Sequence, residues 1–131
     1  MKLKVIKLGR MDYREALELQ TRLWQQVSSG EGQDTLLLVE HPPVITLGVR
    51  GKQEHILLPE EERKRLGVST VQVGRGGDVT YHGPGQIVGY PIMNLNRWGR
   101  DIHDFVHKIE NTFITLLKDD YGIRAERGDK T

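Results

Sequence analysis

Residues 35–47 read TLLLVEHPPVITL, and this stretch says most about the architecture of the chain. The segment TLLLVE at 35–40 contains an unbroken apolar run, which is typical of a buried strand. The HPP triplet at 41–43 ends that strand, because proline has no backbone N–H to donate to a sheet. VITL at 44–47 then resumes as a second strand. The stretch therefore predicts a buried strand, a proline turn and another strand in succession.

Caps and apolar side chains at helical spacing indicate two long helices. Asp12 is placed to cap a helix over residues 13–28, with Glu15 as its capping-box partner. Asp101 caps a second helix, which ends where Gly122 can adopt the left-handed conformation of a C-cap. In both helices the apolar residues form one face for packing. These faces comprise Tyr13, Ala16, Leu17, Leu23, Trp24 and Val27 in the first helix, and Ile102, Phe105, Val106, Ile109, Phe113, Leu116 and Leu117 in the second.

The remaining segments read as strands and one short helix. Alternation at residues 2–8 predicts an edge strand that turns Leu3, Val5 and Leu8 toward the core. Gly89 and Pro91 place a later strand at an edge or a bulge. The order of elements predicts an α+β fold, with helices packed on a mixed, mainly antiparallel sheet, as a single domain over residues 1–131. The further strands are expected at 68–73, 79–81, 86–94 and 123–125, and the short helix between Pro59 and Gly67.

The composition narrows the class of protein. With 131 residues, 37% hydrophobic and 28% charged, the chain has the size and balance of one soluble globular domain. Its 19 basic and 18 acidic residues give a net charge of +1, which provides no electrostatic case for nucleic acid or anionic membrane. No apolar run reaches the ~20 residues of a membrane helix, and the N-terminus does not read as a signal peptide. The absence of cysteine excludes a disulfide framework. We therefore expect a cytoplasmic protein.

Residues 74–86, GRGGDVTYHGPGQ, contain five glycines and point to a ligand-binding loop. Glycine permits positive φ and close approach of the backbone to another molecule. Successive backbone N–H groups could form a concave nest for an oxyanion or a carbonyl oxygen. Arg75 could add a charge-assisted contact, and Thr80, Tyr81 and His82 could donate to a polar head group. The alternative is a hairpin with a glycine bulge. A P-loop is excluded, because no Lys-Ser/Thr follows the glycines.

Other polar side chains offer weaker signals. His103 and His107 have the i, i+4 spacing of the histidine pair in zinc proteases. No third ligand is evident in the sequence, so the favoured interpretation is a solvated helix face. His41 is either a turn residue or a neighbour of the binding loop. Trp24 is expected in the core, and Trp98 lies in a polar loop where a partner could contact it. Several arginines could form a basic rim for an acidic partner, or simply be solubilising: Arg75, Arg97, Arg100, Arg124 and Arg127.

GRGGDVTYHGPGQ, with EHPPVITLG at 40–48 upstream, closely resembles the lipoyl(octanoyl) transferases, the lipoate–protein ligase B family. The resemblance extends over essentially the whole chain, including YPIMNL at 90–95 and both long helices. In the related lipoate ligases a similar glycine loop follows a paired arginine and precedes His-Asp, whereas here His82 is followed by Gly-Pro-Gly. Biotin ligases share the expected fold and differ more.

The resemblance implies an acyltransferase with the biotin/lipoate ligase catalytic-domain fold, acting without ATP, metal or other cofactor. Such an enzyme moves an octanoyl or lipoyl group from acyl carrier protein to a lysine of lipoyl domains, in protein lipoylation and lipoate biosynthesis. The implied acceptors are the lipoyl domains of 2-oxoacid dehydrogenases and the glycine cleavage H protein. The residues that the resemblance implies for the acyl-binding wall are Arg75, Gly76, Gly77, Asp78, Val79, Thr80, Tyr81 and His82.

One departure from the family pattern concerns the nucleophile. The family acts through a cysteine thioester, with a nearby lysine that lowers the thiol pKa. This chain has no cysteine, and Lys130 does not fall in the family's lysine motif. We therefore expect the nucleophile beyond residue 131, and an inactive fragment without it. Two alternatives stay open: an ATP-dependent lipoate or biotin ligase of the same fold, and a non-catalytic acyl-binding module.

Overall fold

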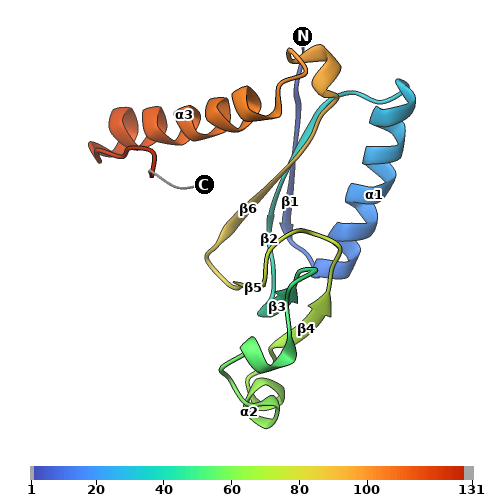
Figure 1. The fold of residues 1–131 in the computed structure, drawn as a ribbon, viewed down its shortest axis with the longest axis vertical. Coiled ribbons are helices and arrows are strands. Elements are labelled where there is room, and N and C mark those ends of the chain that lie inside the picture. Colours follow the sequence, from blue (N-terminus) through green and yellow to red (C-terminus); the bar gives the residue numbers. More distant parts are fainter. Residues whose placement is uncertain (1, 129–131) are drawn as a thin grey trace. The chain divides into compact units, whose positions relative to one another are not determined.

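The computed structural model describes residues 2–128, and Lys130 lies outside this range. The described residues form two compact units, one over Lys2–Met93 and one from Asn94 onward (Figure 1). Secondary structure follows the expected order of strands and helices up to Tyr121. Among the described residues, no helix has both the length and the apolar character needed to cross a bilayer.

The first unit contains two three-stranded sheets, and both are mixed. In one, β2 (Thr35–Glu40) lies between β1 (Lys4–Arg10), parallel to it, and β6 (Ile87–Ile92), antiparallel to it. In the other, β3 (Val44–Leu47) lies between β4 (Ser69–Gln72), parallel, and β5 (Val79–His82), antiparallel. The expected α+β class with a mixed sheet is confirmed, and the position of Gly89 and Pro91 on an edge strand is confirmed as well.

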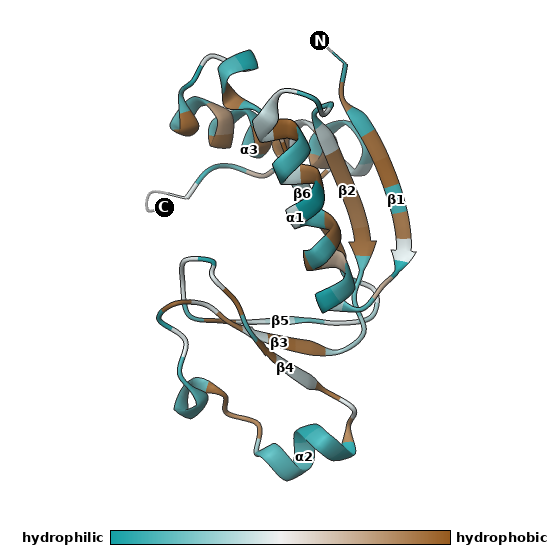
Figure 2. Ribbon diagram, turned by 90° about the vertical axis from the view of Figure 1, so that its right-hand side faces the viewer, coloured by the Kyte–Doolittle hydropathy of each residue, from teal (hydrophilic) through white to brown (hydrophobic). Residues whose placement is uncertain are grey.

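The stretch 35–47 supplies the middle strand of each sheet, which explains its apolar character. Leu37, Val44 and Leu47 are almost completely buried, and β2 and β3 stand out as hydrophobic in Figure 2. A middle strand has neighbours on both edges, so its backbone groups are paired and its side chains are covered. The two-strand interpretation of this stretch is thus confirmed.

Helix α1 (Tyr13–Ser29) packs on the sheet of β1, β2 and β6. The Asp12 carboxylate accepts a hydrogen bond from the Arg14 N–H at 2.8 Å, and Gly30 closes the helix at φ 85°. The cap that the sequence predicted is confirmed. Val27 forms a buried cluster with Leu37 of β2 and Ile92 of β6, which fixes the helix on this sheet.

Two sequence predictions about the core between α1 and the sheet of β1, β2 and β6 are wrong. Ile6 and Leu8 pack against the Val27 cluster, so strict alternation along β1 turns Leu3 and Val5 to the opposite face, where they are exposed. Trp24 is 62% exposed rather than buried. The neighbouring Leu23 faces the sheet, and a residue one step further along a helix points about 100° away from it.

Between β3 and β4 the chain forms two short helical turns, η1 (Gln53–His55) and α2 (Glu60–Arg65). Pro59 precedes α2 and Gly67 follows it at φ 65°, as the sequence predicted. Opposite charges pair along this helix, with the Lys64 ammonium 2.7 Å from the Glu60 carboxylate. The segment is therefore a polar connection outside the two sheets (Figure 2).

The second unit consists of η2 (Leu95–Arg97) and α3 (Ile102–Tyr121). The Asp101 carboxylate accepts from the N–H groups of His103 and Asp104, at 2.8 and 3.1 Å, and Gly122 ends the helix at φ 65°. Both predicted caps are confirmed. The strand predicted at 123–125 is wrong, because these residues pair with no strand in the described part of the chain.

Candidate active site

The glycine loop runs from β4 to β5 and crosses the end of β3. Since β4 and β5 pair with opposite edges of β3, they are not neighbours in the sheet. The interpretation of this region as a hairpin with a glycine bulge is therefore wrong. The 83–85 turn that follows is not a hairpin either, because it leads from β5 in one sheet to β6 in the other.

The carbonyl groups of the loop are held by the turn that follows β3. The three bonds are Val49 N–H to Arg75 O at 3.0 Å, Arg50 N–H to Gly77 O at 3.1 Å, and Gly48 N–H to Asp78 O at 2.7 Å. In contrast, the N–H groups of residues 74–78 donate to no acceptor within residues 2–128. In this loop the carbonyl oxygens accept hydrogen bonds and the consecutive N–H groups are free. Such a row of N–H groups is the kind of nest that binds anions and carbonyl oxygens.

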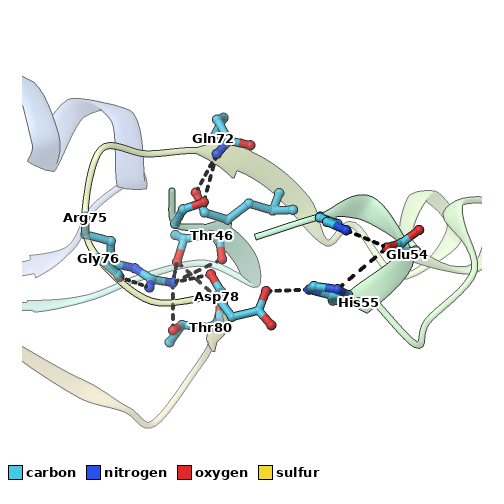
Figure 3. Close-up of polar contacts among 11 residues, drawn as sticks. Thr46, Glu54, His55, Gln72, Arg75, Gly76, Asp78 and Thr80 are labelled. Atoms are coloured by element: carbon cyan, nitrogen blue, oxygen red, sulfur yellow. Dashed lines mark hydrogen bonds and ion pairs between the residues drawn. The ribbon is translucent and has the colours of Figure 1, made fainter. Parts of the chain in front are cut away.

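The Arg75 guanidinium holds the loop from inside (Figure 3). Its Nη2 donates to Thr46 Oγ1 at 2.8 Å and to Thr80 Oγ1 at 2.7 Å, and its Nη1 donates to the Gly76 carbonyl at 2.9 Å. Thr46 is fully buried on β3, so this contact also satisfies a buried hydroxyl. In this structure the guanidinium therefore positions the loop, and a direct contact of Arg75 with a ligand stays a prediction.

Position 48 must be glycine, because the turn at 48–50 and the glycine loop lie very close together there. A Cβ at this position would lie 2.5 Å from the Gly77 carbonyl oxygen and 3.0 Å from that of Arg75. Gly77 itself has φ 88°, a conformation that glycine adopts without strain. The two glycines thus make the contact between turn and loop possible.

Sequence reasoning missed three polar residues that support the loop. The His55 Nδ1 lies 2.7 Å from the Asp78 carboxylate (Figure 3), and the Gln72 amide donates to the carbonyls of Leu47 and Gly48 at 3.1 and 3.0 Å. Thr46 was the one hydroxyl in an otherwise apolar strand, a signal that could have been used. His55 carried no such signal, since its partner lies 23 positions away.

The predicted site residues on β5 lie on different faces of the strand. Thr80, which contacts Arg75, shares a face with His82 because the two are separated by two positions. Val79 and Tyr81 occupy the opposite face, and the Tyr81 ring lies against Gly83, where a Cβ would collide with it. The structure therefore brings together Arg75, Thr80 and His82, and sets Tyr81 apart from them.

An aromatic cluster adjoins His82 on this face of the sheet. Tyr13 stacks on the His82 ring, with centroids 6.0 Å apart and planes at 18°, and the His41 ring lies 5.1 Å from that of Tyr13. His41 is fully buried; its Nδ1 is 2.9 Å from the Met11 carbonyl and its Nε2 is 2.9 Å from the Tyr90 hydroxyl. A carbonyl only accepts, so Nδ1 carries the proton and Nε2 accepts from Tyr90. His41 is thus both a structural turn residue and a neighbour of the candidate site.

The tyrosines of this cluster are poor acids. Burial raises the pKa of Tyr13, although the Arg75 charge and a hydrogen bond with Tyr90 oppose the shift. Burial also raises the pKa of Tyr90, and the proximity of Tyr13 adds to that effect. Both side chains are therefore neutral hydroxyls near neutral pH. Among residues 2–128, no three His, Asp or Glu side chains gather as metal ligands, and His103 and His107 have no third partner.

The fold and the glycine loop are those of the lipoyl protein ligase A/B class of catalytic domains. Residues 12–131 match the family model described as "Lipoyl protein ligase A/B catalytic domain", so the chain belongs to this family. The resemblance that the sequence motifs suggested is confirmed.

Relatives within the family are bacterial proteins named octanoyltransferase. The chain is 53% identical to that of Desulforamulus reducens and 55% identical to that of Caldicellulosiruptor saccharolyticus, in each case over 99% of the chain. It covers 57% and 55% of these two relatives, so it spans somewhat more than half of their length. A crystal structure of P. falciparum LipL1 in complex with lipoate has a similar fold, with a TM-score of 0.72 at 16% identity over 97% of this chain and 39% of that one.

Proposed function

We propose that the protein containing this chain transfers octanoyl groups in protein lipoylation. Membership of the lipoyl protein ligase A/B family and relatives near 50% identity that are named octanoyltransferase support this proposal. The acyl donor is octanoyl-acyl carrier protein, and the acceptor is a lysine on a lipoyl domain of a 2-oxoacid dehydrogenase or of the glycine cleavage H protein. The reaction needs no ATP, and we place it in the cytoplasm.

The observation that carries the proposal is the row of free amides at 74–78. A thioester carbonyl oxygen bound at these amides would accept hydrogen bonds from several N–H groups. These hydrogen bonds would become stronger when the oxygen becomes the oxyanion of the tetrahedral intermediate. Because the Arg75 guanidinium and the 48–50 turn already hold the carbonyl side of the loop, little reorganisation is needed during the reaction. One such donor contributes about 10²–10³-fold in rate in enzymes of this type of chemistry.

In this proposal residues 75–82 form part of the wall around the acyl group, with the amides as the principal contacts. The nucleophile is a cysteine outside these 131 residues, which contain none. A thiolate there would attack the thioester and carry the octanoyl group to the acceptor lysine. The two units described above belong, in this proposal, to one catalytic domain.

The test is octanoyl transfer to a lipoyl domain by the full-length protein, read as the intact mass of the acceptor. Gly76→Val is the informative variant, because Gly76 is exposed, has no positive φ, and a Cβ there would meet nothing within 4 Å. We expect unchanged thermal unfolding and a loss of transfer of about 100-fold, since the valine occupies the space before the amides.

The matched control is Gly128→Val, where a Cβ would also meet nothing within 4 Å, and we expect full transfer from it. If Gly76→Val retained octanoyl transfer, the glycine loop would not be part of the acyl-binding site. Transfer from free octanoate that requires ATP would instead support a ligase of the same fold.

A further inference from the structure

Asp78 carries the one carboxylate in the glycine-rich stretch 74–86. Its backbone N–H belongs to the row of amides that donate to no acceptor within residues 2–128, and its carbonyl accepts from the Gly48 N–H at 2.7 Å. The carboxylate is therefore attached to a residue that also offers an N–H group to a bound oxygen. An aspartate side chain can bind neighbouring backbone N–H groups itself, and its charge repels an oxyanion close to it.

His55 holds this carboxylate in a defined place. The His55 Nδ1 lies 2.7 Å from Asp78 Oδ1, and Figure 3 shows the Asp78 side chain extending from the loop toward His55. A carboxylate only accepts, so Nδ1 carries the proton of this hydrogen bond. The other charged groups near the imidazole come from the connection between β3 and β4: the Glu54 carboxylate lies 3.8 Å from Nε2, and Lys52 pairs with Glu54 at 3.3 Å.

Folding stability does not account for this pair. The side chains of His55 and Asp78 are 36% and 52% exposed, and ion pairs with this much exposure contribute little to stability. The loop backbone is also held without the pair, by the turn at 48–50 and by the Arg75 guanidinium. The main consequence of the contact is therefore the position of the carboxylate itself.

We propose that His55 is a positioning residue, which keeps the Asp78 carboxylate away from the amides of residues 74–78 so that they stay available to the thioester oxygen. This inference rests on the proposed function, in which that oxygen becomes an oxyanion at the same amides. His55 is then needed only because residue 78 carries a carboxylate. Removal of His55 alone releases an internal competitor for the amides, whereas removal of both side chains releases none.

The experiment compares octanoyl transfer to a lipoyl domain by the full-length protein with His55→Ala, with Asp78→Ala and with both substitutions. In His55→Ala we expect the transfer rate to fall by about 10–100-fold, because the released carboxylate competes for N–H donors that each contribute about 10²–10³-fold. In Asp78→Ala and in the double variant we expect transfer close to that of the parent. A contact that merely supported the loop would give a different pattern, with equal losses in all three variants.

Two further variants test the hydrogen bond itself. His55→Asn keeps an N–H donor at the same number of bonds from Cβ as Nδ1, and we expect it to retain most of the transfer. His107→Ala removes an exposed histidine on α3 and is the matched control, for which we expect the parent rate. Thermal unfolding shows whether each variant is folded.

Parent-like transfer by His55→Ala would overturn the proposal, and so would a double variant as slow as His55→Ala. If His55→Ala does not fold, Asp78→Ala decides: unchanged transfer supports the proposal, and a loss of transfer would show that the loop needs the carboxylate. A parent protein that transfers no octanoyl group to any acceptor would refute the proposed function itself, whereas failure of this inference alone leaves transfer by the parent intact.

Discussion

Arg75 shows how one side chain can hold a glycine-rich loop in a fixed conformation. A glycine-rich loop is costly to order, because glycine loses more backbone freedom than any other residue. The guanidinium offsets part of this cost by donating to Thr46, Thr80 and the Gly76 carbonyl from one fixed plane. Lysine cannot reproduce these contacts, since its ammonium lacks the planar arrangement of donors.

We expect Arg75→Lys to lower the free energy of unfolding by about 1.5–3 kcal/mol, because charge-assisted hydrogen bonds to Thr46 and Thr80 are lost. Octanoyl transfer should fall by about 10–100-fold, because the amides lose their fixed geometry. Denaturant unfolding and the transfer assay measure these effects. Arg50→Lys is the control, since the Arg50 side chain makes no hydrogen bond or ion pair within the described residues, and equal effects from both variants would contradict the positioning role.

The raised pKa values of Tyr13 and Tyr90 predict how the free energy of unfolding changes at alkaline pH. Both have a pKa raised above 10.0 in the folded protein, so the folded state keeps protons that the unfolded state releases. The contribution of these two tyrosines to the free energy of unfolding is therefore fully present below about pH 10. It is lost as the pH rises through their pKa values in the folded protein. Urea unfolding across this range should show a decline that is smaller in Tyr90→Phe, whereas Tyr121→Phe, exposed on α3, should behave like the parent. An unchanged decline in Tyr90→Phe would contradict the assignment.

At the level of elements, the sequence predicted the segments that form strands, with one false strand at 123–125, but not which strands pair. The apolar content of residues 35–47 marked the two middle strands, and caps marked both long helices. That β4 and β5 both pair with β3 depends on contacts between segments distant in the sequence, which local patterns do not contain. The same limitation explains why His55 was not assigned to the site, and why Leu3 and Val5 were assigned to the wrong face of β1.

The turn after β3 and the glycine loop form one structural unit, and Gly48 is where they meet. We expect Gly48→Ala to destabilise the protein and abolish transfer, because its Cβ would lie 2.5 Å from a backbone oxygen that the loop cannot move without breaking its own contacts. Gly76→Ala is the matched control, since its Cβ would meet nothing within 4 Å. Thermal unfolding of the two variants measures the difference, and equal stability would show that the turn and the loop are independent.

At the level of the whole molecule, the proposed function assigns to this chain one part of the chemistry of acyl transfer. The glycine loop offers free amides, while the cysteine that the family uses is absent from these residues. In the proposed function, binding of the acyl carbonyl and formation of a covalent intermediate are therefore separable, because they depend on different segments of the protein.

This separation predicts the behaviour of a polypeptide of only these 131 residues. Incubated with octanoyl-acyl carrier protein, it should form no stable acyl-enzyme, because it has no thiol to accept the octanoyl group. An acyl group on His82 would be an acylimidazole, which water hydrolyses. Intact mass spectrometry measures the result, with the full-length protein as the positive control. A stable adduct that carries one octanoyl group would show that a residue of this segment is the nucleophile, and peptide mapping of that adduct would identify it.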